Sequence, residues 1–372
     1  MSPLNLRRVF YTLAILLFLC PAYCDEHAHP DGHEHGSTGQ GPDDNSPLGV
    51  MGDHTHQAGE VMLSYRYGIM EMNGNLDGSA TASTRDILDA GFMMAPTSMR
   101  MEMHMIGAMY GVSNSITLMA MLPLKRMEMI SEMPMPDMPN MIMRRKALSS
   151  GAGDLKLTGI VPLWAAGDHS RMLKLTAGLS IPTGSIKETG AGRNMAGEMP
   201  MRLAYPMQMG SGTFDLLPGL TYLAQRDGWS WGAQANSVIR LGENGEGYSL
   251  SNRIQATAWY SRKLSDMLSA SARIEGATWG NIDGQDAAMD RELSPNARAD
   301  LRGGERIEIL FGLNLNFDET IDRLNKAFDE TAEKSPETVN LAIEIGFPIH
   351  QDLDGPQMEN DWRLMIGLQL GF

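Results

Sequence analysis

Histidine and methionine are the residue types whose number and spacing in this sequence could support chemistry. Six of the nine histidines lie close to the amino terminus, in "HAHPDGHEH" and "DHTH": His27, His29, His33, His35, His54 and His56. Imidazoles at this spacing suit Cu(II), Ni(II) or Zn(II), and a flexible segment can wrap around such an ion. The alternative is a polar, solvated linker without a ligand.

Methionine is the second unusual residue type, with 31 in the chain and 19 of them between Met62 and Met143. Thioethers are soft ligands that favour Cu(I), but methionine also serves as a flexible hydrophobic side chain that fills irregular space. Both interpretations stay open. We expect no required cofactor, but a bound copper ion is compatible with the soft-metal hypothesis. Its proposed methionine ligands are Met62, Met70, Met72, Met119, Met121, Met133, Met135, Met138, Met141 and Met143.

Motifs for catalysis are missing from the sequence. It contains no nucleophile elbow, no phosphate-binding loop and no zinc-binding helix pattern. Asp53-His54 and Asp168-His169 each place a carboxylate beside an imidazole, but no nucleophile lies nearby. We therefore expect that the protein is not an enzyme, with a catalytic barrel such as a lipase as the alternative.

The amino terminus resembles a secretory signal peptide, because Arg7 and Arg8 precede the apolar run "VFYTLAILLFLC". Cleavage after Cys24 would remove both cysteines and leave a formal charge of 28 − 45 = −17. Such an acidic chain argues against nucleic acid as a partner. We expect three parts: a signal peptide (1–24), a disordered, His-rich tail in the periplasm (25–59) and a folded domain (60–372).

Alternation of apolar and polar residues, the signal of a β-strand, recurs throughout residues 60–372. We expect twelve strands, near 60–73, 97–110, 115–130, 153–164, 171–184, 211–225, 228–242, 248–263, 267–281, 303–317, 337–349 and 361–372. Tight turns alternate with longer connections, near 74–96, 131–152, 185–210, 282–302 and 350–360. This arrangement predicts an all-β fold, an antiparallel transmembrane β-barrel. The connection 318–336 breaks the pattern, and its helical spacing of apolar residues predicts a small periplasmic helix.

Each expected strand has one apolar face and one polar face. In the stretch "MRMEMHM", Met99, Met101, Met103 and Met105 alternate with polar residues. Because a charge near the lipid midplane costs about 2–4 kcal/mol, we expect these methionines to face lipid. The residues expected to face a watery lumen are Arg66, Arg100, Glu102, His104, Lys156, Lys174, Asp215, Arg240, Arg253, Arg273, Glu275, Arg306, Glu308, Glu344 and Arg363. They either select a permeating solute or fill and rigidify the barrel.

The chain ends in "WRLMIGLQLGF", an apolar ladder that closes on the aromatic Phe372. It resembles the carboxy-terminal strand that marks bacterial outer-membrane barrels for their assembly machinery. Together with the signal peptide, it predicts location in the outer membrane of a Gram-negative bacterium. The expected partners are membrane lipid, the barrel-assembly machinery and a small solute or metal ion.

Several longer stretches carry a resemblance to a known family: "GVMGDHTHQAGEVMLSYRY", "MEMHMIGAMYGV", "GDLKLTGIV", "YPMQMGSGTFDLLPGLTY", "WSWGAQA" and "QDLDGPQMENDWRL". From about Leu48 to Phe372, the sequence resembles bacterial outer-membrane transporters of the "MetA-pathway of phenol degradation" type. This resemblance implies a barrel that takes up a solute or hydrophobic compound. The layout of a His/Met-rich segment before a barrel also resembles the outer-membrane copper-resistance protein B family.

These observations favour an outer-membrane barrel that passes or sequesters a small solute, linked to copper or another soft metal through its histidines and methionines. Two alternatives stay open. One is a channel for aromatic or other hydrophobic compounds, as the first resemblance implies. The other is a structural barrel that transports nothing.

Overall fold

The computed structural model describes residues 46–135, 138–194, 197–317 and 338–372. The chain divides into two units, Met1–Gly39 and Gln40–Phe372, and every described residue belongs to the second. Within the described residues, no helix is both long and apolar enough to cross a membrane. The predicted signal peptide, the histidines from His27 to His35 and the whole of the predicted helix 318–336 lie outside the described residues.

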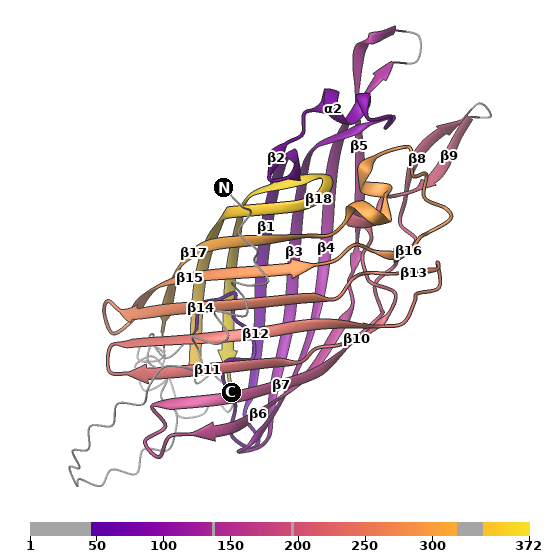
Figure 1. Ribbon diagram of the computed structural model, residues 1–372. Helices are drawn as coiled ribbons and strands as arrows, with labels where there is room; N and C mark the ends of the chain where they lie inside the picture. The colour runs from indigo at the N-terminus through magenta and orange to yellow at the C-terminus, as the bar shows by residue number, and fades with distance from the viewer. Residues whose placement is uncertain (1–45, 136–137, 195–196, 318–337) are drawn as a thin grey trace, which may run out of the picture. The chain divides into compact units, whose positions relative to one another are not determined.

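Strands dominate the described part of the chain (Figure 1). They are β1 (Val61–Gly78), β2 (Ala80–Thr81), β3 (Ala95–Ser113), β4 (Ile116–Met135), β5 (Met138–Ala152), β6 (Leu155–Ala165), β7 (Arg171–Ile181), β8 (Thr189–Asn194), β9 (Gly197–Arg202), β10 (Phe214–Leu216), β11 (Gly219–Arg226), β12 (Trp229–Leu241), β13 (Tyr248–Ser249), β14 (Arg253–Lys263), β15 (Leu268–Trp279), β16 (Asp283–Gly284), β17 (Gly304–Asn316) and β18 (Thr338–Gly371). The helical elements are short: α2 (Thr84–Asp89), η1 (Tyr205–Met207), η2 (Pro295–Ala297) and η3 (Ala299–Leu301).

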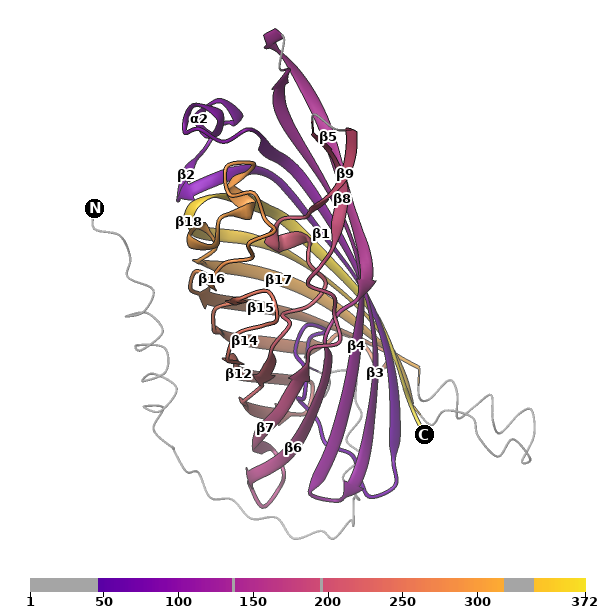
Figure 2. The same ribbon diagram turned by 90° about the vertical axis from the view of Figure 1, so that its right-hand side faces the viewer.

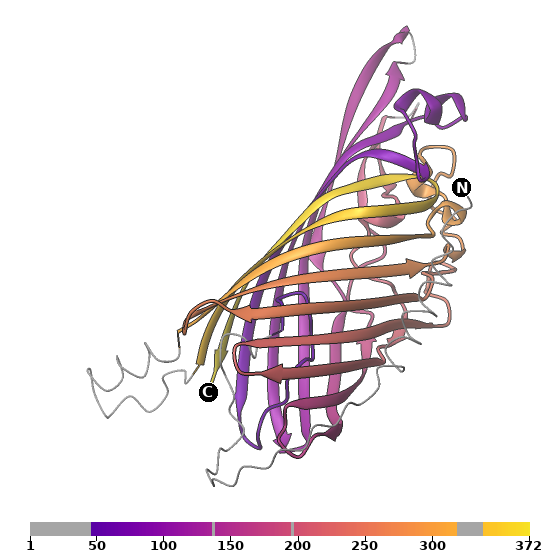
Figure 3. The same ribbon diagram turned by 60° about the vertical axis from the view of Figure 1, so that its left-hand side comes forward.

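The main sheet is antiparallel and closes on itself. Its neighbours run β12-β11-β7-β6-β4-β3-β1-β18-β17-β15-β14, and pairing of β12 with β14 joins the two ends. β18 makes two passes, because residues 340–353 pair with β17 whereas residues 353–371 pair with β1. Figure 3 shows these passes as two yellow ribbons beside the indigo β1. Closure removes the open sheet edge that lipid could not satisfy, so the predicted antiparallel barrel is the observed fold.

Most of the predicted strands agree with the observed ones to within a few residues, but three predicted loops contain strands. The predicted loop 185–210 contains the hairpin of β8 and β9. Residues 138–152, predicted as loop, form β5, which extends the β4 hairpin beyond the neighbouring strands (Figure 2). Residues 350–360 lie within β18, where the turn between its two passes is confined to a few residues around Gly355 (φ 93°). At β5 and β18, strand pairing continues past the apolar pattern from which the predicted boundaries came.

A belt of exposed apolar side chains surrounds the barrel. Leu63, Leu175 and Leu368 come from β1, β7 and β18, and they are 46%, 38% and 36% exposed. Their sequence neighbours Met62, Lys174 and Gly367 are buried on the opposite face. A continuous apolar surface of this kind marks contact with a membrane or another protein. Together with closure of the sheet, it indicates that the outside of the barrel faces lipid.

The assignment of faces was wrong for β3. Met99, Met105 and Met109 are buried inside the barrel, and the residues predicted to face the lumen, Arg100, Glu102 and His104, lie on the outer face. Arg100 pairs with Glu71 at 3.3 Å and with Glu102 at 3.1 Å, and the Tyr65 hydroxyl bonds the His104 ring at 2.7 Å.

The reason for this reversal is the length of the strands. Below His104, the outer face of β3 carries Ile106 and Tyr110, which are 52% and 49% exposed. β1, β3 and β4 therefore continue past the apolar belt, so the charges of their upper halves avoid the lipid interior. The prediction placed these charges inward because a charge is costly in hydrocarbon. A charge on the outer face beyond the apolar belt avoids that cost equally well.

Candidate functional site in the barrel interior

A segment of the chain that precedes β1 lies in the barrel interior. Residues 46–59 belong to the predicted disordered tail, but Leu48, Val50 and His56 are 5%, 2% and 8% exposed. Trp259 and Leu223, from the inner faces of β14 and β11, pack around Val50. Residues 46–57 were predicted to be part of a disordered tail, but they pack inside the barrel. We call residues 46–57 the interior segment.

Hydrogen bonds from several strands hold the interior segment in place. Lys174 Nζ on β7 donates to the carbonyl of Asp53 at 2.5 Å, and Gln234 Nε2 on β12 donates to the carbonyl of Met51 at 2.7 Å. The amide of His56 donates to Thr117 Oγ1 on β4 at 2.8 Å. These contacts satisfy backbone groups that would otherwise be buried without partners. The interior segment is thus bound to strands on several sides of the barrel.

Glycines allow the interior segment to approach the wall. A Cβ at Gly49 would lie 2.1 Å from Arg273 Nη2 and 2.6 Å from Glu344 Oε1. A Cβ at Gly111 of β3 would lie 1.8 Å from the carbonyl oxygen of Gln57. Both positions need a residue without a side chain, because the neighbouring atoms are backbone or firmly bonded side chains.

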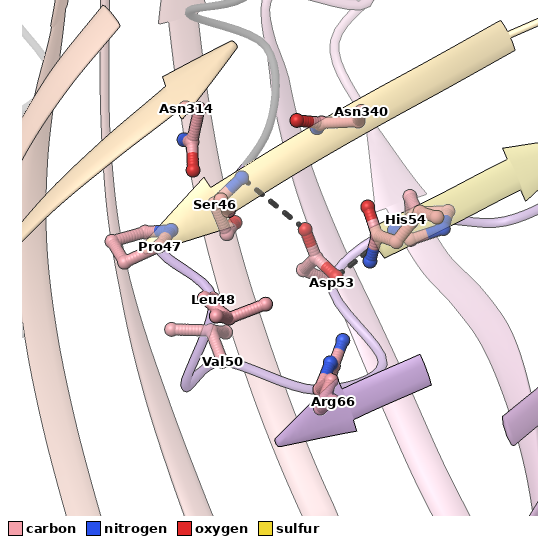
Figure 4. Close-up of a pocket in the computed structure, with 11 residues that line it drawn as sticks. Ser46, Pro47, Leu48, Val50, Asp53, His54, Arg66, Asn314 and Asn340 are labelled. Carbon is pink, nitrogen blue, oxygen red and sulfur yellow. Dashed lines mark hydrogen bonds and ion pairs between the residues drawn. The ribbon is translucent and has the colours of Figure 1, made fainter. Parts of the chain in front are cut away.

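A small cavity lies between the interior segment and strands β1, β17 and β18 (Figure 4). The amide of Ser46 donates to the Asp53 carboxylate at 3.4 Å, and His54 bonds the same carboxylate at 2.9 Å. Arg66 points toward this cavity and is 7% exposed. Within the described residues, Arg66 Nε, Asn314 Nδ2 and Asn340 Oδ1 have no hydrogen-bond partner. Such atoms suit a polar occupant.

Ion pairs connect β15, β17 and β18 on the inner face. Arg273 contacts the carboxylates of Glu275 and Glu344, and all three residues are less than 5% exposed. Arg363 lies 2.9 Å from both Glu275 and Glu308. These pairs link opposite charges within β15 and between strands that lie close together on the inner wall. Of the predicted lumen residues, those facing inward are Arg66, Lys156, Lys174, Asp215, Arg240, Arg253, Arg273, Glu275, Arg306, Glu308, Glu344 and Arg363.

A cluster of methionines lies above this charged wall. Its buried members are Met99, Met127, Met129, Leu203, Met207 and Met209, and Met72, Met101 and Met358 pack against them. β1, β3, β4 and β18 supply the wall residues, whereas residues 203–209 come from the connection after β9. Methionine side chains thus pack the loop against the wall of the barrel. We call these nine residues the methionine cluster.

The loops around this cluster have a core of their own. Tyr205 and Tyr248 pack edge to face with ring centroids 5.0 Å apart, beside buried Ile282 and Met289. Arg202 lies 2.8 Å from Glu246 and 3.3 Å from Asp286. The hydrogen bond from Lys187 and the nearby Arg202 hold the pKa of Glu246 below its usual value. Asn296, also from these loops, donates to Met129 Sδ at 3.3 Å, so the loop layer is fixed to the methionine cluster.

Within the described part of the chain, the predicted metal ligands lie in several separate places. Met62 and Met119 pack with Met109 and Ile160, whereas Met72 belongs to the methionine cluster. Met70 accepts a hydrogen bond from Asn360, Met121 is buried on β4, and Met133, Met135, Met141 and Met143 lie in the β4–β5 hairpin, with Met138 at its far end. Of the described histidines, His54 and His56 have ring centroids 5.1 Å apart.

Sequence reasoning missed two features, one inside the barrel and one on the opposite face of its wall. Met207 and Met209, 0% and 1% exposed, lie in a predicted loop without periodicity, so no local signal marked them as buried. Glu305, His350 and Asp352 bring potential ligand atoms within 4.8 Å of one another on β17 and β18. Pairing of Glu305 with Asp352 across the two strands creates this group. The sequence does not reveal the register of these two strands, so this group could not be found from the sequence.

Comparison with known proteins supports the fold. No family model matches the chain, and no curated protein matches it. An outer membrane channel from Pseudomonas putida F1 superposes with a TM-score of 0.55 at 13% identity, covering 86% of this chain and 98% of that one.

Two other solved structures superpose less well. A Pseudomonas aeruginosa FadL homologue has a TM-score of 0.37 at 12% identity and covers 84% of this chain and 90% of its own. The toluene transporter of Pseudomonas putida has a TM-score of 0.37 at 10% identity, with coverages of 85% and 90%. Neither carries an argument about this chain.

The pairing of the strands and the first comparison together show a closed antiparallel β-barrel fold similar to that of the P. putida F1 outer membrane channel.

Proposed function

We propose that the protein is an outer-membrane channel for small solutes, and that the interior segment and the methionine cluster form its two constrictions. The observation that supports this proposal most strongly is the difference in polarity between the two faces of one closed sheet. The outer face carries the apolar belt, and the inner face carries buried, hydrogen-bonded charges. A protein that only anchored itself in lipid would gain nothing from charges in its interior, because burial of charge is costly.

The chemistry of the methionine cluster favours aromatic or other apolar solutes. Thioether side chains are flexible, and sulfur contacts aromatic rings favourably. A solute that crosses this level must displace or slide past Met99, Met127 and Met129 on the wall and Met207 and Met209 on the loop. An apolar ring suits that surface better than a strongly hydrated group does.

Soft-metal handling is the second candidate, and the same cluster supports it. Thioethers favour Cu(I) or Ag(I), and the cluster gathers eight methionines. The amino-terminal histidines would then collect the ion on the periplasmic side. Nothing in the fold similarity bears on this candidate.

One triple variant separates the two candidates. Replacing Met99, Met127 and Met129 by Leu keeps the apolar volume but removes three sulfurs, at a cost below about 1.5 kcal/mol for each near-isosteric exchange. In proteoliposome swelling, we expect the parent and the variant to admit phenylalanine faster than glutamine, a polar solute of comparable size. Equal rates for the two solutes, or no swelling at all, would contradict the channel proposed here.

Titration with Ag(I) gives the other half of the test. A soft-metal site predicts binding by the parent that the triple Leu variant loses. Binding that survives in the variant, or that is absent from both proteins, would leave the methionines with an apolar role only.

A further inference from the structure

Four basic side chains gather on the inner wall directly below the methionine cluster. They are Lys125 of β4, Lys156 of β6, Arg240 of β12 and Arg253 of β14. Strand pairing aligns Lys156 with Arg240, because Lys156 lies opposite Ser180, Ser180 opposite Asp215, and Asp215 opposite Arg240. Lys125, Arg240 and Arg253 are all close enough to Lys156 to repel its charge.

Three of these cations have partners of their own. Lys125 Nζ donates to the carbonyl of Met209 at 2.8 Å, and Arg240 pairs with Asp215. The Arg253 guanidinium lies over the Trp279 ring, 5.2 Å from its centroid. Lys156 differs from them: in the parts of the chain that the structure describes, its ammonium group has neither a hydrogen bond nor an ion pair.

The two carboxylates near Lys156 are already occupied. Asp154 accepts from the amide of Gly184 at 2.9 Å, and from the amide and hydroxyl of Ser211 at 2.7 and 2.9 Å. Asp215 accepts from Thr213 Oγ1 at 2.7 Å and pairs with Arg240. Lys125, Lys156 and Arg240 thus face two carboxylates whose lone pairs are largely used, whereas Arg253 lies closer to Glu275 and Glu308. Lys156 is half-buried, and an ammonium group withdrawn in part from water is costly unless an anion approaches it.

The methionine cluster lies next to these cations. Met127 follows Lys125 by two residues on the same face of β4, and Lys125 itself bonds the carbonyl of Met209. One level of the interior is therefore cationic and the adjoining level is apolar and rich in sulfur. A solute that satisfies both has an aromatic ring joined to a negatively charged group.

We propose that Lys156 and the three neighbouring cations form a binding site for small aromatic carboxylates. This inference rests on the proposed channel function and names its substrate class. Lys156 donates charge-assisted hydrogen bonds to the carboxylate, and the ring packs against the thioethers of the methionine cluster. The site also gives the channel a preference for anions, although the chain as a whole is acidic.

Benzoate binding to the full chain in detergent tests the site without any need for transport. We expect calorimetry to detect benzoate binding, and Lys156→Gln to weaken it about tenfold, the loss that one charge-assisted hydrogen bond produces. Lys146→Gln is the matched control, because Lys146 carries the same charge on the outer side of the β4–β5 hairpin, paired with Glu128 at 2.6 Å. The control should bind benzoate as the parent does.

Gluconate, a polar carboxylate, and chloride distinguish an aromatic site from a general anion site. The proposal expects both to compete poorly with benzoate. Equal affinity for all three anions, equal loss in both variants or no benzoate binding by the parent would overturn it.

Reversal potentials in planar bilayers then address the channel separately. Anion preference that falls in Lys156→Gln and not in Lys146→Gln supports both proposals. Benzoate binding without any conductance would count against the channel and leave the binding site standing.

Discussion

Deletion of residues 46–57 should raise the conductance of the barrel several-fold in planar bilayers. The interior segment bonds to β4, β7 and β12 through Thr117, Lys174 and Gln234, so it occupies space between the walls. Its removal leaves the barrel closed by strand pairing alone, which involves none of its residues. We expect longer and larger openings, measured as single-channel conductance at fixed salt.

A single substitution checks the same point without shortening the chain. In Gly49→Leu the new side chain would overlap Arg273 and Glu344, so the interior segment should shift and the conductance should rise. Gly245→Leu is the control, because a Cβ there meets nothing within 4 Å. If both variants and the deletion conduct like the parent, the interior segment does not obstruct a pathway.

Arg273→Leu should destabilise the barrel by about 3–5 kcal/mol, the usual cost of removing one partner from a buried ion pair. The change leaves Glu344 and Glu275 buried, and only Glu275 keeps a second arginine, Arg363 at 2.9 Å. Denaturant unfolding in detergent micelles, followed by tryptophan fluorescence, measures the loss.

Arg100→Leu is the matched control for this prediction. Arg100 also pairs with two carboxylates, Glu71 and Glu102, but its side chain is 50% exposed on the outer face. Exposed pairs contribute about 0–1 kcal/mol, so the control should lose little. Similar losses in the two variants would mean that the inner wall is as well hydrated as the outer surface.

The barrel itself could be predicted from the sequence because its strands obey one local rule. Period-two alternation in stretches such as 171–181 and 304–316 fixes both the strand and its buried face. Those runs lie mostly within the apolar belt, where every outward residue meets lipid. The face of β3 could not be fixed in the same way, because its outward residues meet lipid near Tyr110 and water near Arg100.

The interior of the barrel was much less predictable. The stretch "SPLGVMGDHTH" has no period, and Leu48 and Val50 became buried only because strands distant in sequence surround them. The methionine cluster likewise depends on a loop, residues 203–209, folding onto β3 and β4. Apart from Arg100, Glu102 and His104, the predicted lumen charges lie on the face that alternation set, whereas a soft-metal site would require contacts between loops that no local pattern reveals.

A disulfide between the interior segment and the wall tests the central claim most directly. Leu48 Cγ, the position that the sulfur of a cysteine would take, lies 3.3 Å from the Cβ position of Gly367 on β18, so cysteines at 48 and 367 lie within bonding reach. The account predicts that Leu48→Cys/Gly367→Cys forms this disulfide in the outer membrane and holds conductance low until a reductant is added. Failure of the two cysteines to join under oxidising conditions would show that residues 46–57 do not occupy the barrel interior.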